Sequence, residues 1–72
     1  MTTVKEIEVK FEKHQKSGNN TYMIPAKNMN DWYKDELLFV RKVENNTVTV
    51  FRSMDGKIYT LSEAKLIDFK LL

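Results

Sequence analysis

The sequence predicts a mainly all-β domain: a small barrel of five to six short antiparallel strands, with a long early loop and one or two short helical turns. Two observations lead to this prediction. Residues 44–61, ENNTVTVFRSMDGKIYTL, place two tight-turn signals between runs rich in β-branched and aromatic residues. Residues 7–12 alternate apolar and charged side chains, which is the period of a strand with one buried face.

The chain has the size and composition of one small globular domain, residues 1–72. It is 42% hydrophobic and 11% aromatic, and a chain of this length buries only about 60% of its unfolded surface. It has no cysteine, which excludes disulfides and fits a reducing cytoplasm. No apolar run approaches the ~20 residues of a membrane span, and the charged start MTTVKEIEVK is unlike a signal peptide. We therefore expect a cytoplasmic protein with no membrane partner.

The first predicted element is the alternating strand at residues 7–12. A helix is the alternative, because four side chains follow a three–four spacing: Val4, Ile7, Phe11 and His14. Val9 would point away from the apolar stripe of that helix, and the β-branched content favours the strand.

Residues 16–36 are predicted to form a turn, a short strand and a long loop. The turn is KSGNN, because glycine and asparagine tolerate positive φ. The strand TYMI ends at Pro25, which lacks a ladder donor. Residues 26–36 show no alternation and are expected to form a loop with at most a short helix, capped by Asn30 or Asp31.

The second half of the chain contains the clearest strand signals. LLFVRKV, VTVFR and IYTL are predicted strands, separated by two-residue turns at Asn45-Asn46 and Asp55-Gly56. SEAKL is predicted to form a short helical turn with Ser62 as its N-cap. The apolar segment IDFKLL follows as a last strand.

The order of these elements resembles that of an SH3-like barrel: a long loop, a central meander, a short 3₁₀-type turn and a closing strand. The resemblance covers roughly residues 34–72, including the acidic lead-in and apolar strand DELLFVRKV. It rests on element order and turn placement. The tyrosine-rich loop motif by which SH3 domains bind proline-rich peptides has no counterpart in this sequence, so the resemblance implies a fold and not a ligand.

The two tight turns predict which residues lie opposite each other. About Asn45-Asn46, Val43 faces Val48, Arg41 faces Val50 and Phe39 faces Arg52. About Asp55-Gly56, Ser53 faces Ile58, Arg52 faces Tyr59 and Val50 faces Leu61. One face then carries an apolar patch, formed by Val43, Val48, Val50 and Leu61.

Arg52 is expected between two aromatic rings, Phe39 and Tyr59, on the same face as this patch. Its stem would pack at the rim of the core, with the charged head in water and a cation–π contact of ~0.5–1 kcal/mol. The alternative is a basic-aromatic recognition spot with Arg41 and Lys57 nearby. A bulge would re-aim these side chains, and Arg41 opposite Val50 indicates that the ideal register breaks.

No catalytic, metal or cofactor motif is present in the sequence. The single histidine, His14, is expected to be a solvated surface residue, and no serine lies in a G-x-S-x-G elbow. The carboxylates Asp31, Asp35 and Glu36 are expected to be solvated loop residues rather than a divalent-ion site. The chain has two glycines and no phosphate-binding loop. We expect a protein that is not an enzyme and that needs no cofactor or metal.

The leading functional hypothesis is a non-catalytic protein-binding module or inhibitor, in the manner of a small accessory protein of bacterial or phage origin. Trp32 is expected to plug the core rather than to anchor a partner, and Tyr33 fits either role equally. The candidate partner-binding residues are Trp32, Tyr33, Phe39, Arg52 and Tyr59.

The alternative is a nucleic-acid-binding barrel, in which cations contact phosphates and aromatic rings stack on bases. Its candidate residues are Arg41, Arg52, Lys57 and Tyr59. The net charge is only +2, from twelve basic and ten acidic residues, and the signs are interleaved. Glu6, Glu8 and Glu12 are expected along one exposed strand face, which predicts feeble nucleic-acid binding.

Overall fold

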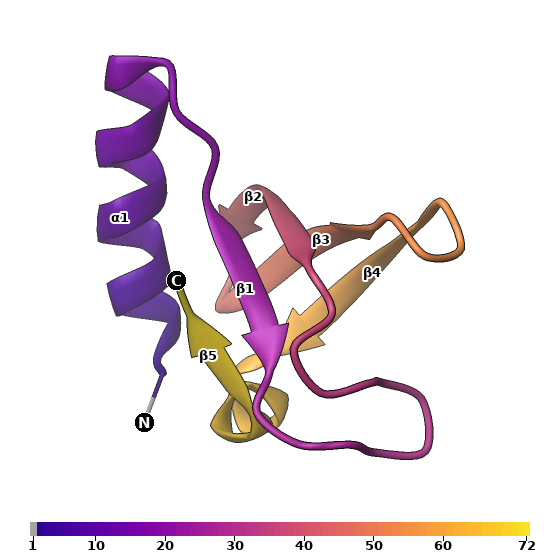
Figure 1. Cartoon of the computed structure of the whole chain (residues 1–72). Coiled ribbons are helices and arrows are strands. Elements are labelled where there is room, and N and C mark those ends of the chain that lie inside the picture. Colours follow the sequence, from indigo (N-terminus) through magenta and orange to yellow (C-terminus); the bar gives the residue numbers. More distant parts are fainter. Residues whose placement is uncertain (1) are drawn as a thin grey trace.

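The computed structural model describes residues 2–72 as one helix beside a five-stranded antiparallel sheet (Figure 1). The sheet has the order β4-β3-β2-β1-β5. The elements in chain order are α1 (Val4–Ser17), β1 (Tyr22–Pro25), β2 (Leu38–Glu44), β3 (Thr47–Arg52), β4 (Lys57–Ser62), the 3₁₀ helix η1 (Glu63–Asp68) and β5 (Phe69–Leu71).

The strand predicted at residues 7–12 is wrong, because this segment lies inside the helix α1. Ile7 is fully buried, whereas Val9, two residues later, is 55% exposed. Two neighbouring residues on one strand face would be buried together, so this difference is the signature of the helical period. The three–four spacing of Val4, Ile7, Phe11 and His14, given above as the helical alternative, agrees with this helix. The β-propensity of single residues depends on context and was the less reliable criterion.

Both ends of α1 carry capping signals that the sequence already contains. The Thr3 hydroxyl accepts a hydrogen bond from the backbone N–H of Glu6 at 3.2 Å, as an N-cap does. At the other end Gly18 adopts the left-handed conformation (φ 75°), and the N–H of Asn19 bonds the His14 carbonyl at 2.8 Å. These caps fix the helix between Thr3 and Gly18.

The sheet is not closed into a barrel among residues 2–72. β4 and β5 are its two edges, and η1 connects them at one end. The strand TYMI and the last strand are confirmed as β1 and β5, which pair with each other, and SEAKL is confirmed as the start of η1. Residues 26–37 form the predicted long loop, which contains bends and turns and no helical turn.

The first hairpin has the predicted turn but a different register beyond it. Asn45 and Asn46 both take positive φ, and Val43 pairs with Val48, as predicted. A bulge between Val40 and Lys42 then inserts one residue. Side chains of a strand alternate with period two, so a shift of one residue moves Phe39 to the opposite face of the sheet. The predicted pairs of Arg41 with Val50 and of Phe39 with Arg52 are therefore wrong.

The second hairpin has a four-residue loop, residues 53–56, in place of the predicted two-residue turn. Arg52 pairs with Lys57, and the Gly56 N–H bonds the Arg52 carbonyl at 2.8 Å. A two-residue turn of the predicted kind needs positive φ at both central positions, whereas here Gly56 (φ 68°) takes it and Asp55 does not. The Asp55 carboxylate instead accepts a bond from the Lys57 N–H at 3.0 Å.

This second difference shifts the pairing by two residues, so each side chain keeps its predicted face. Tyr59 now lies opposite Val50, and Arg52 stays on the same face. The pairs predicted for Ser53, Arg52 and Val50 across this turn are wrong, but the shared face is right.

The core lies between α1 and the face of the sheet that carries Val48 and Val50. Three of the four residues of the predicted apolar patch are buried, Val48, Val50 and Leu61, and Val43 packs against them. The remaining buried apolar residues come from every other element: Val4, Ile7, Met23, Leu38, Val40, Leu66 and Phe69. The helix therefore supplies a side of the core that the sheet leaves open.

Candidate functional site

Arg52 is the centre of a polar and aromatic cluster at the end of β3. Its guanidinium donates two hydrogen bonds to Glu36, from Nε to Oε1 at 2.7 Å and from Nη2 to Oε2 at 3.0 Å. The two side chains are only 10% and 7% exposed. Asp55 Oδ2 lies 3.6 Å from Nη1 on the other side. This bidentate geometry, which suits arginine and carboxylate, ties the long loop to the sheet.

Two rings cover the guanidinium, but one of them differs from the expected pair. Arg52 Cζ lies 4.9 Å from the centre of the Trp32 ring and 5.9 Å from that of Tyr59. The expected contact with Phe39 is wrong, because the bulge in β2 places that ring on the opposite face. Glu36, expected to be solvated, is instead buried as the partner of Arg52.

Trp32 packs against the core, as predicted. Its ring meets Tyr59 and Phe69 edge to face, with centroid distances of 5.0 and 5.4 Å. Tyr33, the next residue, is 59% exposed. The loop is held around them by hydrogen bonds, since Glu36 Oε2 accepts from the Tyr33 N–H at 2.7 Å. Tyr33 is therefore a free aromatic side chain on an ordered loop.

Hydrogen bonds and charges within the cluster shift three pKa values. The bond to Glu36 raises the pKa of Arg52 above its ordinary value. The Tyr59 hydroxyl donates to Asp55, which lowers the pKa of the Asp55 carboxyl and raises that of the Tyr59 phenol. Among residues 2–72, no buried side-chain polar atom lacks a hydrogen-bond partner. The cluster is thus internally satisfied, with no buried donor directed at a ligand.

The opposite, outer face of the sheet carries an apolar row that the sequence reasoning found only in part. Backbone pairing places four side chains in line across four strands: Tyr22, Phe39, Phe51 and Ile58. We call these four residues the outer row. Tyr22 and Phe39 pack edge to face at 4.9 Å, and Phe39 and Phe51 at 6.2 Å. Ile58 ends the row and is 55% exposed.

Of the outer row, the sequence reasoning selected only Phe39. The other three residues could not be selected because of the bulge in β2. A register without a bulge, continued from Val43, places Phe39 on the core side of the sheet, so that it does not lie opposite Phe51. One feature of the sequence did indicate the bulge: without it, the charged Arg41 would lie opposite the core residue Val50. Shifting β2 by one residue to remove that conflict brings Phe39 opposite Phe51.

Polar side chains border the outer row on the same face. The adjacent line of paired residues is Lys42, Thr49 and Thr60. Lys42 Nζ lies 2.8 Å from Glu44 Oε1 in an exposed ion pair. At the other margin Lys70 lies opposite Ile24. The outer row is therefore an uncharged strip with a polar margin on the Lys42 side and a mixed margin, of Ile24 and Lys70, on the other.

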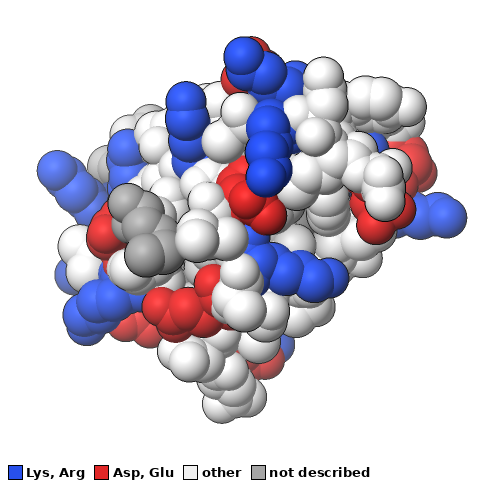
Figure 2. Space-filling model, turned by 90° about the horizontal axis from the view of Figure 1, so that it is seen from below, with Lys and Arg blue, Asp and Glu red and all other residues white. Residues whose placement is uncertain are grey.

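The residues of the nucleic-acid alternative do not form one accessible basic surface. Arg52 is buried against two carboxylates, and the Tyr59 hydroxyl is bonded to Asp55. Arg41 and Lys57 are exposed but belong to β2 and β4, at the bulge and at the start of the strand. The view in Figure 2 likewise shows basic and acidic side chains interspersed.

His14 is not the solvated side chain that was expected. It is partly buried on the core side of α1, and its Nδ1 lies 2.8 Å from the Thr21 hydroxyl, which is itself buried. This contact joins the end of the helix to the start of β1.

Among residues 2–72 no group of three or more His, Cys, Asp or Glu side chains is placed to hold a metal ion. The helix α1 is neither long nor apolar enough to cross a membrane.

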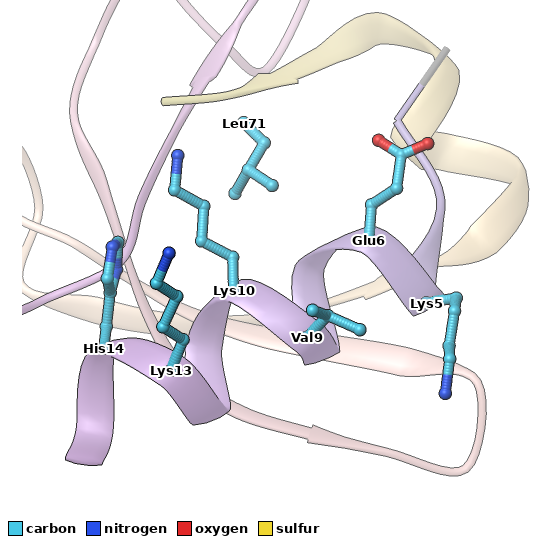
Figure 3. Close-up of a pocket in the computed structure, with 7 residues that line it drawn as sticks. All are labelled: Lys5, Glu6, Val9, Lys10, Lys13, His14 and Leu71. Atoms are coloured by element: carbon cyan, nitrogen blue, oxygen red, sulfur yellow. The ribbon is translucent and has the colours of Figure 1, made fainter.

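Among the surface hollows of residues 2–72 are three that adjoin the elements described above. The largest of these three, about 460 Å³, lies between α1 and β5 (Figure 3). A second, about 200 Å³, lies between the long loop and η1, beside Trp32 and Lys65. A third, about 210 Å³, lies beside Phe39 and Arg41, next to the start of β1.

Comparison with protein-family models, curated proteins and solved structures finds no match for this chain.

Proposed function

We propose that the chain is a non-catalytic protein-binding module whose docking surface is the outer row. The observation that carries this proposal is the continuous apolar line from Tyr22 to Ile58 on the solvent face of the sheet. Cross-strand aromatic pairs stabilise a sheet, but the exposed Ile58 has no such role at an edge strand. A contiguous apolar strip of large side chains is the usual centre of an interface.

We further propose that the fold is an SH3-like small barrel with an added N-terminal helix. The strand order β4-β3-β2-β1-β5, the long loop after β1 and the 3₁₀ helix before the last strand support this proposal. In this reading α1 packs against the central strands β2 and β3, and η1 packs against the two edge strands β4 and β5. The cluster around Arg52 then holds the long loop in place and is not the binding site itself.

A protein partner fits the outer row better than a nucleic acid does. Binding to a nucleic acid depends on several cations close to the stacking rings. On the outer face Lys42 is paired with Glu44, and Lys70 lies at the margin. The partner that we propose is therefore a protein with an apolar contact surface, and the proposed setting is that of a small accessory or inhibitory protein.

The test compares two lysine substitutions on the same face of β4. Ile58→Lys places a charge in the outer row, whereas Thr60→Lys places it one line away; both positions are exposed, so neither should unfold the chain. Proteins captured from a lysate of the source cell with the wild type are identified, purified and titrated against both variants. We expect Ile58→Lys to weaken binding at least about tenfold, the loss of one ~1.4 kcal/mol contact, and Thr60→Lys to bind like the wild type.

Salt titration distinguishes a protein partner from a nucleic acid on the outer row, and light scattering detects binding of a second copy of the chain. Burial of apolar area is not screened, so a protein complex should depend weakly on salt. Tight single-stranded nucleic-acid binding with a log–log salt slope of about −0.7 per phosphate contradicts the proposal and favours the alternative. A dimer that Ile58→Lys dissociates would assign the outer row to a second copy of the chain instead.

A further inference from the structure

The largest of the three hollows lies between α1 and the edge strand β5, away from the outer row. It is lined by Leu71 of β5 and by residues of α1: Lys5, Glu6, Val9, Lys10, Lys13 and His14. In Figure 3 the Lys10 and Lys13 side chains extend from the helix toward the β5 side of the hollow. Its volume of about 460 Å³ falls in the range of sites that bind ligands. We call this hollow the α1–β5 groove.

The walls of the groove combine apolar surface with positive charge. Val9 and Leu71 contribute apolar side chains, and Val9 is 55% exposed. Three lysines face one carboxylate, that of Glu6, among the lining residues. Lys5 is drawn away to Glu8 by an ion pair at 3.6 Å, and Lys10 bonds the Leu72 carbonyl. The ammonium of Lys13 has no such partner among residues 2–72, so an acidic ligand would complement this wall.

The strand beside the groove also offers backbone hydrogen-bonding groups. β5 ends the sheet, and on its inner side the Leu72 N–H bonds the Tyr22 carbonyl at 3.0 Å. The Ala26 N–H likewise bonds the Asp68 carbonyl at 2.8 Å. Successive residues of a strand direct their backbone groups to alternate edges. The N–H and C=O of Leu71 therefore point to the free edge, on the side that an added strand would occupy.

We infer that the α1–β5 groove binds an acidic, extended segment of a partner protein as an additional strand on β5. The backbone of the segment would pair with Leu71. Side chains of a strand alternate between its two faces, so the groove-facing positions, every second residue, would carry both the apolar side chains that contact Val9 and Leu71 and the carboxylates that meet Lys13 and Lys10. Strand addition supplies main-chain hydrogen bonds, and side-chain contacts select the sequence. This inference does not depend on the outer row, which lies on a different surface.

The probe is the fluorescein-labelled hexapeptide Glu-Thr-Val-Thr-Glu-Thr, which carries glutamate, valine and glutamate on one face of a strand, titrated by fluorescence anisotropy. Two matched peptides accompany it: one replaces the glutamates with lysines, and one replaces the valine with proline. Proline removes a ladder donor, so we expect about tenfold weaker binding, the equivalent of one hydrogen-bonded contact. The lysine peptide should not bind, because it repels the groove.

Variants of the chain locate the binding. Lys13→Glu should weaken the glutamate peptide about tenfold by replacing attraction with repulsion, and Glu6→Gln should tighten it. Lys16→Glu, an exposed change on the same helix outside the groove, is the matched control and should have no effect. Urea unfolding checks that each variant is folded.

The inference is overturned by any of three results. One is no binding of the glutamate peptide at millimolar concentration. Another is equal binding of the proline peptide, which would exclude strand addition. The third is an equal loss in Lys13→Glu and Lys16→Glu, which would mean that net charge alone is recognised. Retained peptide binding in Ile58→Lys separates this site from the proposed function.

Discussion

Arg52 and Glu36 form a buried, bidentate ion pair that joins β3 to the long loop, with Nε and Oε1 2.7 Å apart. Both side chains are largely removed from water, and their desolvation is offset by several contacts. These are their mutual hydrogen bonds, the Trp32 and Tyr59 rings near the guanidinium, the Asp55 carboxylate and the Tyr33 N–H that Glu36 accepts. The ordered loop that presents Tyr33 depends on this pair. Its removal should therefore affect stability much more than the removal of an exposed pair.

Glu36→Ala should destabilise the chain by about 3–5 kcal/mol, because it removes the bidentate partner of the buried Arg52 charge and leaves only the Asp55 carboxylate, 3.6 Å away. The exposed pair between Lys42 and Glu44, 2.8 Å apart with side chains 58% and 52% exposed, is the matched control. Glu44→Ala should cost less than about 1 kcal/mol. Urea unfolding followed by tryptophan fluorescence measures both, since Trp32 lies over the affected arginine. Equal losses in the two variants would contradict the structural role of the buried pair.

The hydrogen bond from Tyr59 to Asp55 should make stability depend on pH at both ends of the scale. The pKa of Asp55 is lowered from its ordinary value of 3.8, so its contribution is present above that pH and is lost as the pH falls through the lower folded value. The pKa of Tyr59 is raised from 10.0, so its contribution is present below that pH and is lost as the pH rises through the higher folded value.

Tyr59→Phe removes the shared hydrogen bond and should flatten both limbs of the stability profile. Unfolding free energies measured from about pH 2 to about pH 11 test this, with Tyr33→Phe as the control at an exposed tyrosine. If the Tyr59→Phe profile stays parallel to that of the wild type at both limbs, the bond does not couple these two groups to folding.

The sequence predicted the sheet well where short-range turn chemistry decides the structure. Asn45-Asn46 placed the first hairpin, because both residues tolerate the positive φ that the turn needs. Pro25 ends the short strand β1, as the missing N–H of proline predicts. These features depend on one or two residues, so they can be recognised without knowing the tertiary structure.

The N-terminal helix and the outer row could not be predicted from the sequence, for two different physical reasons. For residues 7–12 the periods of helix and strand both fitted, and tertiary burial of Ile7 decided between them. For the outer row, one bulged residue at Arg41 exchanged the faces of the preceding part of β2. No particular residue type marks this bulge in the sequence. The face on which Phe39 lies could therefore be inferred only from the unfavourable pair of Arg41 with Val50 that a register without a bulge produces.

Gly18 should be needed for its backbone conformation and not for space. It ends α1 with φ 75°, and a β-carbon placed there meets no atom within 4 Å. Gly18→Ala should therefore cost about 1 kcal/mol from the left-handed backbone alone, and Gly18→Asn should cost less, because asparagine tolerates this region. Thermal unfolding of the two variants measures the order. A Gly18→Asn protein less stable than Gly18→Ala would require another explanation for this helix end.

Ile7 and Val9 should respond very differently to truncation. Ile7 is fully buried against the core, whereas Val9 lies on the exposed side of α1 in the α1–β5 groove. Ile7→Ala should cost about 2–4 kcal/mol through lost burial and the cavity that remains, and Val9→Ala should stay within about 0.5 kcal/mol. In a strand the two side chains would share one face, and the two losses would be similar. Urea unfolding of both variants therefore measures whether this segment folds as a helix in solution, and similar losses would restore the strand.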